Sequence, residues 1–216
     1  MIKKVDILGI QLDNYTVREA IMCVERYLSN NVLNTIESIS LQMLIDSETN
    51  PVLKEVMSSL DLAIIGEKEI IQAAGLESMQ RIRETEENDF YFEFFKRIER
   101  NKKSVFLLGD TQEKIDSLKA ELAEDYPKLI FAGEYAVETC VGDLEAVIND
   151  MNATTPDVII SVLPSPMQEQ FLYEHRDKMN ANIWYGIGGV PVHKKKHGVL
   201  AVSYTHLRAH ETRRHL

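Results

Sequence analysis

Short runs of apolar residues alternate along this chain with longer segments in which apolar positions recur every three or four residues. Continuous apolar runs are typical of strands buried on both faces of a parallel sheet, whereas the longer spacing is typical of amphipathic helices. The runs predict six or seven strands. They lie at residues 5–10, 34–39, 60–65, 104–108, 129–132, 157–163 and 183–187.

Helical patterns follow most of these runs. Thr16, with Glu19 three residues later, forms a capping-box signature, which predicts a helix that continues through the apolar positions up to Leu28. Further helices are predicted at residues 41–47, 66–75, 89–100, 111–124, 143–151 and 167–179. Strands that alternate with helices in this way predict an α/β fold, with a mostly parallel sheet and helices on both faces.

Three sharp turns from strand to helix are predicted at Gly66, at Gly109 and at residues 164–166. Ligands of open parallel sheets bind outside the carboxyl ends of the strands, so we expect the functional site among these turns. The chain contains no internal repeat and no low-complexity linker, and a single domain is therefore expected.

The composition and charge narrow the class of protein. The chain has 216 residues, of which 44% are hydrophobic and 27% charged, as in ordinary globular proteins. Residues 192–216 hold six Lys and Arg, one acidic residue and five of the six histidines, so the first 191 residues carry 18 basic against 33 acidic residues. A body with a net charge of −15 argues against a general nucleic-acid partner.

Cysteine usage and hydropathy point to a reducing, cytosolic setting. Cys23 and Cys140 are too few and too isolated for a disulfide scaffold or a zinc site, and we interpret them as small buried apolar residues. The N-terminus lacks the apolar run of a signal peptide, and no stretch approaches the 18 apolar residues of a membrane-spanning helix.

The first candidate for chemistry is Gly109 with Asp110 after the strand at 104–108. A glycine there lets backbone N–H groups at a helix start approach a phosphate, but an ordinary strand-to-helix turn explains it equally well. The G-x-G-x-x-G and G-x-x-x-x-G-K-[ST] patterns of dinucleotide and P-loop sites are absent.

Two further candidates follow the next strands. Gln168 and Glu169 fall in the first turn of a helix, where an amide and a carboxylate suit sugar hydroxyls, or else cap and solvate the helix. Gly186, Gly188 and Gly189 imply close approach of the backbone to a ligand or to a neighbouring helix.

The fourth candidate is the charged run at residues 81–89 (RIRETEEND). An arginine near the mouth of the sheet can hold a diphosphate with two parallel hydrogen bonds, although a solvated helix start is the simpler interpretation. No Ser, Cys and His pattern suggests a nucleophilic triad, and we expect His175 to be an ordinary residue on a helix surface.

Five segments taken in order carry a more specific pattern. They are VDILGIQLDNYTVREAI, LDLAIIGEKEIIQAAG, SVFLLGD, AEDYPKLIFAGEYA and NATTPDVIISVLPSPMQEQFLYEHRDKMNANIWYGIGG, within residues 5–189. These segments resemble the WecG/TagA/CpsF family of bacterial glycosyltransferases (glycosyltransferase family 26). The resemblance implies a Rossmann-like α/β core. It also implies transfer of a sugar such as N-acetylmannosamine from its UDP form to a lipid-diphosphate-linked acceptor, in teichoic-acid or cell-surface polysaccharide synthesis.

The resemblance also implies which residues react and bind. The family has an Asp-Gly pair after the strand at 60–65, and its Asp is the proposed catalytic base; this chain has Gly66 and Glu67 there, so Glu67 is the expected base. The family's Thr-x-Asn loop appears as two serines, and its Arg-x-Thr-Gly segment appears as Arg-x-Thr-Glu. Residues expected to bind the substrate or the nucleotide are Ser38, Ser40, Arg83, Thr85, Gly109, Asp110, Gln168, Glu169, Gly186, Gly188 and Gly189.

The end of the chain departs from the family. Residues 200–216 resemble a translated sequencing adapter, so we expect one native domain over residues 1–199 and a truncated C-terminal appendage. His206, His210 and Glu211 have the spacing of a metal-binding helix, but the adapter interpretation is preferred because no folded pattern precedes them. The basic cluster at residues 193–197 would suit an anionic membrane surface.

The sequence therefore predicts a glycosyltransferase with a UDP-sugar donor and a lipid-linked acceptor, without cofactor or metal. We expect it in the cytoplasm or peripheral to the inner face of the plasma membrane. Because Gly66 replaces the Asp, the alternative is a catalytically inactive relative that binds a nucleotide sugar or a partner enzyme. A dehydrogenase-like protein is disfavoured by the missing glycine fingerprint. The sequence leaves open whether the chain forms a homo-oligomer.

Overall fold

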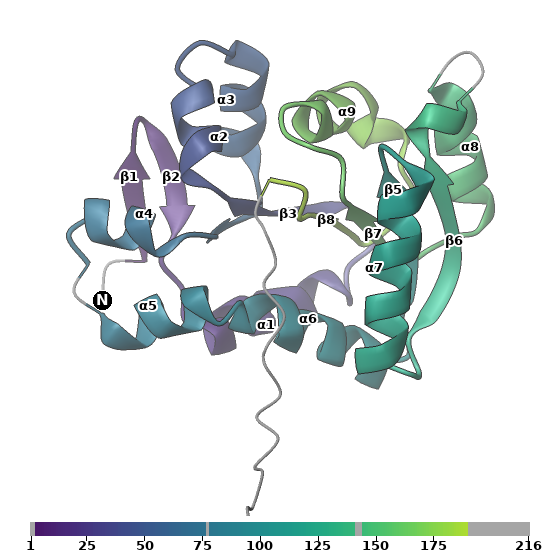
Figure 1. The fold of residues 1–216 in the computed structure, drawn as a ribbon, viewed down its shortest axis with the longest axis horizontal. Coiled ribbons are helices and arrows are strands. Elements are labelled where there is room, and N and C mark those ends of the chain that lie inside the picture. The colour runs from purple at the N-terminus through teal and green to yellow at the C-terminus, as the bar shows by residue number, and fades with distance from the viewer. Residues whose placement is uncertain (1–2, 77, 141–143, 190–216) are drawn as a thin grey trace, which may run out of the picture.

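The computed structural model describes residues 3–76, 78–140 and 144–189. Its described part contains one eight-stranded sheet with the strand order β1-β2-β4-β3-β8-β7-β5-β6 (Figure 1). All neighbouring strands are parallel except the β1–β2 pair. The strands are β1 Lys4–Ile7, β2 Ile10–Asp13, β3 Asn34–Ile39, β4 Leu62–Ile65, β5 Ser104–Gly109, β6 Ile130–Ala136, β7 Val158–Ser161 and β8 Ile183–Gly186. The predicted α/β class with a mostly parallel sheet is confirmed.

The helices cover both faces of this sheet. One face packs against α2 Leu41–Asp46, α3 Pro51–Ser59, α8 Glu145–Ala153 and α9 Met167–His175, and the other against α1 Val17–Tyr27, α6 Asp89–Arg100 and α7 Gln112–Asp125 (Figure 1). Two shorter helices, α4 Lys68–Ala73 and α5 Met79–Glu86, connect β4 to α6. Two 3-10 helices lie at Val137–Thr139 and Arg176–Lys178.

The alternation of side chains along each strand divides the core in two. In β8, Trp184 belongs to the cluster under α3 and α9, whereas Ile183 and Tyr185 belong to the cluster under α1 and α6. This is the period of two expected of an extended strand. Every strand residue therefore has a defined face, which decides which residues can meet at a site.

The first predicted strand, at residues 5–10, was wrong in one respect. The apolar run is a hairpin, and Leu8 and Gly9 turn between β1 and β2 with φ values of 53° and 80°. Positive φ at both central residues is the geometry of a type I′ turn, which Asn-Gly usually provides. Leucine at the first position removed that signal, so the run appeared continuous.

Two helices were missed by the pattern, and one strand was predicted too short. Helix α3 begins with Asn50 as its cap and Pro51 at its first position, and α5 carries mostly charged and polar residues. The strand predicted at 129–132 continues as β6 to Ala136. The capping box of Thr16 and Glu19 is confirmed, as are the turns at Gly66, Gly109 and 164–166.

The carboxyl ends of β3, β4 and β8 lie beside one another, although β8 comes from the opposite end of the chain. The loops that follow these strands therefore converge on one edge of the sheet, where a ligand site of an open α/β fold is expected. Within the described ranges, no helix has the length and hydropathy needed to cross a membrane. The predicted tail at 200–216, His206, His210 and the basic cluster at 193–197 lie outside the described residues.

Candidate functional site

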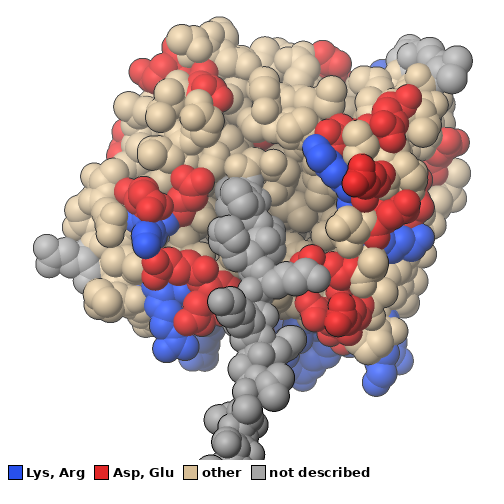
Figure 2. Space-filling model, viewed as in Figure 1, with Lys and Arg blue, Asp and Glu red and all other residues tan. Residues whose placement is uncertain are grey.

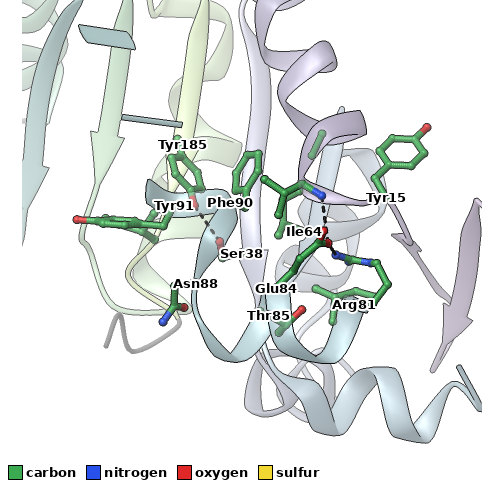
Figure 3. Close-up of a pocket in the computed structure, with 15 residues that line it drawn as sticks. Tyr15, Ser38, Ile64, Arg81, Glu84, Thr85, Asn88, Phe90, Tyr91 and Tyr185 are labelled. Carbon is green, nitrogen blue, oxygen red and sulfur yellow. Dashed lines mark hydrogen bonds and ion pairs between the residues drawn. The ribbon is translucent and has the colours of Figure 1, made fainter. Parts of the chain in front are cut away.

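A pocket opens at the carboxyl ends of β3, β4 and β8, on the face of the sheet that α1 and α6 cover. Its lining combines four aromatic rings with hydroxyl and amide groups (Figure 3). The aromatic residues are Tyr15, Phe90, Tyr91 and Tyr185; the polar residues include Ser38, Thr85 and Asn88; and Ile65, Gly66 and Ile187 complete the mouth. The pocket therefore lies beside the predicted turn at Gly66, and its lining does not include the predicted turns at Gly109 and residues 164–166.

One face of α5 provides much of the polar wall. Arg81, Glu84, Thr85 and Asn88 all line the pocket and follow the i, i+3, i+4, i+7 spacing of a single helical stripe. Figure 3 shows the Arg81 and Glu84 side chains directed toward each other beside Thr85. Asn88 ends this stripe with a left-handed backbone, at φ 52°, immediately before α6 begins.

The charge of Arg81 is neutralised inside the wall. Its Nη1 donates to Glu84 Oε2 at 2.9 Å, and its Nε donates to Asn14 Oδ1 at 3.4 Å. The same Glu84 oxygen accepts the Val17 N–H at 3.2 Å, at the first residue of α1. An ion pair that is satisfied in this way leaves the pocket without a net charge from these two groups.

The opposite wall is held by a hydrogen bond between two strands. The Ser38 Oγ lies 3.2 Å from the Tyr185 hydroxyl, joining β3 to β8 across the pocket (Figure 3). Burial raises the pKa of Tyr185 far above its ordinary value, with the Ser38 bond opposing that shift, so the phenol keeps its proton. Ser38 and Thr85 are thus predicted site residues that the structure brings together around one pocket.

Glu67 and Ser40 form a neighbouring group at the start of α2. Glu67 Oε2 accepts the Leu41 N–H at 2.9 Å, and Ser40 caps the same helix by accepting the Met43 N–H at 3.2 Å. Ser40 is buried, whereas Glu67 is half-buried at the mouth of the sheet, next to the pocket residue Gly66.

Gln168 and Glu169 lie on the other face of the sheet and are fully buried. Gln168 donates to Glu169 Oε1 at 3.2 Å and accepts the Gly188 N–H at 3.3 Å. Glu169 Oε2 also accepts the Ser165 hydroxyl at 2.9 Å. Through these bonds Gln168 and Glu169 tie the start of α9 to the loops at Ser165 and Gly188.

Neighbouring protein atoms explain the cluster of glycines after β8. A Cβ atom on Gly188 would lie 1.8 Å from the Leu163 carbonyl oxygen, and one on Gly189 would lie 2.4 Å from the Met43 sulfur. A Cβ on Gly186 would lie 2.4 Å from Gln168 Nε2. Of the two interpretations left open by the sequence, close approach to another part of the protein is therefore the one that these contacts support.

The remaining predicted residues lie elsewhere. Gly109 packs against Ile115 of α7, and the Asp110 carboxylate pairs with Lys114 at 2.6 Å. Arg83 points away from the pocket, with a side chain that is 75% exposed and bonded to Glu87. The structure does not bring these three residues to the pocket lining.

Three functional candidates were missed by sequence reasoning. Arg81 and Glu84 belong to the charged run that was singled out, but helix α5 was not predicted, and only a helix shows that they share a face with Thr85. Buried Glu37 on β3 gave no signal, because its apolar surroundings come from strands distant in sequence.

The surface seen in Figure 2 carries two groups of acidic side chains. One group lies over α4 and α5, and the other lies over α7.

Comparison with known proteins identifies the family of this chain. The family model described as the glycosyl transferase WecG/TagA/CpsF family matches residues 5–191. The N-acetylglucosaminyldiphosphoundecaprenol N-acetyl-beta-D-mannosaminyltransferases of Staphylococcus aureus strains NCTC 8325 / PS 47 and COL are each 22% identical over 188 residues. Those matches cover 86% of this chain and 73% of each relative. The resemblance inferred from the five sequence segments is confirmed.

Proposed function

Because this chain belongs to the glycosyl transferase WecG/TagA/CpsF family, we propose that it transfers an N-acetylmannosamine-like sugar from a UDP donor to a lipid-diphosphate-linked sugar. The names of the Staphylococcus relatives support this pair of substrates, since they specify an N-acetylmannosaminyl group and a diphosphoundecaprenol acceptor. A lipid-linked acceptor would bring the protein to a membrane surface, as a peripheral protein at the inner face.

The neutral, aromatic pocket carries the proposal. Sugar rings present apolar C–H faces that pack on aromatic rings and hydroxyls that pair with polar groups, and the half-buried Tyr15, Ser38 and Thr85 of the lining offer both kinds of contact. The pairing of Arg81 with Glu84 makes this lining suited to an uncharged acetamido sugar rather than to a diphosphate.

The reaction needs a base for the acceptor hydroxyl. We assign this role to Glu67: it would take the proton as the hydroxyl oxygen attacks the anomeric carbon and the bond to the UDP oxygen breaks. Its Oε2 is anchored on the Leu41 N–H, which leaves Oε1 to accept that proton. The carboxylate is thereby oriented by the backbone of α2.

The departing UDP carries developing negative charge. The N-terminal ends of α7 and α9 lie at the same edge of the sheet and offer positive dipole ends to that charge. Arg83 lies outside the pocket lining, so to join them it would have to leave Glu87 and turn toward this edge of the sheet. Leaving Glu87 costs little, because exposed ion pairs contribute about 0 to 1 kcal/mol.

The decisive assay incubates the protein with UDP-N-acetylmannosamine and an N-acetylglucosaminyl-diphospho-lipid and follows the disaccharide-lipid product. Transfer is expected, with Glu67→Gln lowering kcat by about 10² or more, while Glu69→Gln on the exposed side of α4 serves as the matched control. Undiminished transfer by Glu67→Gln would overturn its assignment as the base.

Gly66 favours a second candidate, an inactive relative that binds a nucleotide sugar. Calorimetric titration with UDP separates the two possibilities: binding without turnover supports the inactive relative, and binding with turnover supports the transferase. The absence of UDP binding would contradict both.

A further inference from the structure

Glu37 is a carboxylic acid in the middle of the apolar core. It lies on β3 between Ile36 and Ser38, and its side chain is completely withdrawn from solvent. Because side chains alternate along a strand, Glu37 faces α9 on one side of the sheet, while Ser38 faces the pocket on the other. Such a position is costly for a charge, so the residue calls for a physical explanation.

The partners of Glu37 come from β8 and α9. The Trp184 indole donates to Glu37 Oε1 at 3.4 Å, whereas Oε2 has no hydrogen-bond partner among the described residues. The Gln168 amide packs against the same spot. A Cβ on Gly186 would lie 2.4 Å from Gln168 Nε2 and 2.9 Å from Glu37 Cγ, so both side chains press on that glycine.

A second buried acid, Glu169, completes the group. Gln168 lies between the two acids: it donates to Glu169 at 3.2 Å, and its amide interacts favourably with Glu37. Farther along α9, the His175 ring is separated from this group by Phe171, whose ring stacks on Trp184. Glu169 is the charged neighbour that acts on Glu37.

The two acids differ in how well hydrogen bonds stabilise a negative charge on each of them. Burial, and then the charge of Glu169, raise the pKa of Glu37 well above its ordinary value. Burial also raises the pKa of Glu169, but its bonds from Ser165 and Gln168 oppose that shift. Glu37 is therefore the member of the pair that binds a proton more readily, and Glu169 is the member on which a negative charge is better stabilised.

This group holds the end of β8 in place. Trp184 and Gly186 face the acids, and the Gly188 N–H is bound by Gln168. The alternate residues, Tyr185 and Ile187, line the pocket on the opposite face. Any shift of the segment that the acids hold would therefore move a wall of the pocket.

We propose that Glu37 is a positioning residue, which acts with Glu169 through Gln168 and Trp184 to fix the β8 end that forms one wall of the pocket. This inference rests on the proposed function in so far as the pocket binds a sugar, but the acid pair itself can be tested without any substrate. Glu37 does not line the pocket, so its effect on the pocket is indirect and passes through the β8 end with Tyr185 and Ile187.

Trp184 is the only tryptophan in the chain and reports directly on Glu37. Ionisation of the carboxyl group 3.4 Å from the indole nitrogen changes the electric field at the ring, so emission should titrate at a pH above the ordinary carboxyl range. We expect this transition in the native protein, its loss in Glu37→Gln, and a shift to lower pH in Glu169→Gln. Glu174→Gln, exposed on the same helix, is the control and should titrate like the native protein. A native protein without the transition, or Glu37→Gln that retains it, overturns the acid pair.

Unfolding as a function of pH gives a second readout. A carboxyl group whose pKa is raised on folding binds more protons in the folded state, so the native protein loses stability as pH rises above the ordinary carboxyl range. Glu37→Gln lacks this loss. Its melting temperature should therefore rise relative to that of the native protein as the pH increases. A constant difference in melting temperature would contradict the assignment.

Positioning itself is tested by comparing a conservative and an apolar replacement. Glu37→Gln should keep KM for the donor within about threefold, whereas Glu37→Met, which loses the bond to Trp184, should raise KM about tenfold or more. Equal kinetics for the two variants would overturn a positioning role.

Exchange of the Gly188 amide hydrogen provides the readout if the native protein transfers no sugar. In ¹⁵N-glycine-labelled protein we expect Gly188 to exchange at least about tenfold faster in Glu37→Met and unchanged in Glu37→Gln. The lack of transfer by the native protein would reject the proposed function, while this difference in exchange would retain the positioning role. Equal exchange in both variants would reject the positioning role.

Discussion

The guanidinium of Arg81 donates to the carboxylate of Glu84 across 2.9 Å inside the pocket wall, with side chains only 6% and 14% exposed. The pair joins α5 to the first residue of α1 through the Val17 N–H, which Glu84 also accepts. Two segments of the wall, α5 and the start of α1, are thus joined through one ion pair. This makes the pair a structural element of the pocket as well as part of its lining.

Replacing Arg81 with Met should destabilise the protein by about 2 to 4 kcal/mol, because Glu84 is left charged and without its strongest partner. Urea unfolding measures this difference. The matched control is Arg83→Met, two residues away, whose exposed pair with Glu87 should contribute no more than about 0.5 kcal/mol. The double variant Arg81→Met/Glu84→Met should regain at least half of the loss, and an Arg81→Met variant as stable as Arg83→Met would contradict the prediction.

The contrast between Arg81 and Arg83 shows where the sequence analysis reached its limit. Thr85 and Arg83 were both expected to bind substrate, but residues two apart on a helix point in different directions. Because α5 has few apolar residues, its periodicity was weak and the helix was not predicted. Once the helix is known, residues 81, 84, 85 and 88 form one stripe, and Arg81 replaces Arg83 as the arginine beside Thr85 in the pocket.

Gly188→Ala should destabilise the protein by about 3 kcal/mol, since the added methyl would lie 1.8 Å from the Leu163 carbonyl oxygen, a backbone atom that cannot rotate away. Thermal unfolding measures the loss. Gly75→Asn is the control: its glycine has φ 66° with open space around it, and Asn tolerates that conformation at a cost of about 1 kcal/mol or less. Equal losses in the two variants would show that the close contact with Leu163 is not present.

The sheet was largely predictable, whereas the buried acids were not. Runs such as 104–108 and 183–187 are apolar throughout, and only a strand buried on both faces tolerates that composition. Glu37 lies in the more polar segment 34–39 (NTIESI) and is of a residue type that normally indicates exposure. Its burial depends on α9 and β8 closing over it, and those contacts span 147 positions in the sequence.

Glu19 should make the stability of the protein depend on acidic pH. Lys3 first, and then the backbone and hydroxyl of Thr16, lower the pKa of Glu19 from 4.5 to about 2. A lowered carboxyl pKa adds stability above the ordinary value, and this stability is lost as the pH falls from about 4.5 toward 2. The melting temperature of Glu19→Gln should therefore fall less steeply across this window. Because the Lys3 pair is partly exposed, about 0.5 M salt should narrow the difference, and parallel curves at low salt would refute the expectation.

The catalytic assignment of Glu67 can be tested by moving the carboxylate one residue back. In Glu67→Gln, transfer should fall by about 10² or more, because no base accepts the acceptor proton. Adding Gly66→Asp should restore at least a tenth of the activity, about 1.4 kcal/mol in the barrier, since residue 66 lines the pocket. Positive φ occurs at Gly9 and Gly75 among the described glycines, so the backbone at residue 66 accepts an aspartate. Gly66→Asn in the same background is the control, as it adds the same volume without a base. Recovery in the Asn variant, or none in the Asp variant, would show that the reaction does not depend on a carboxylate at this turn.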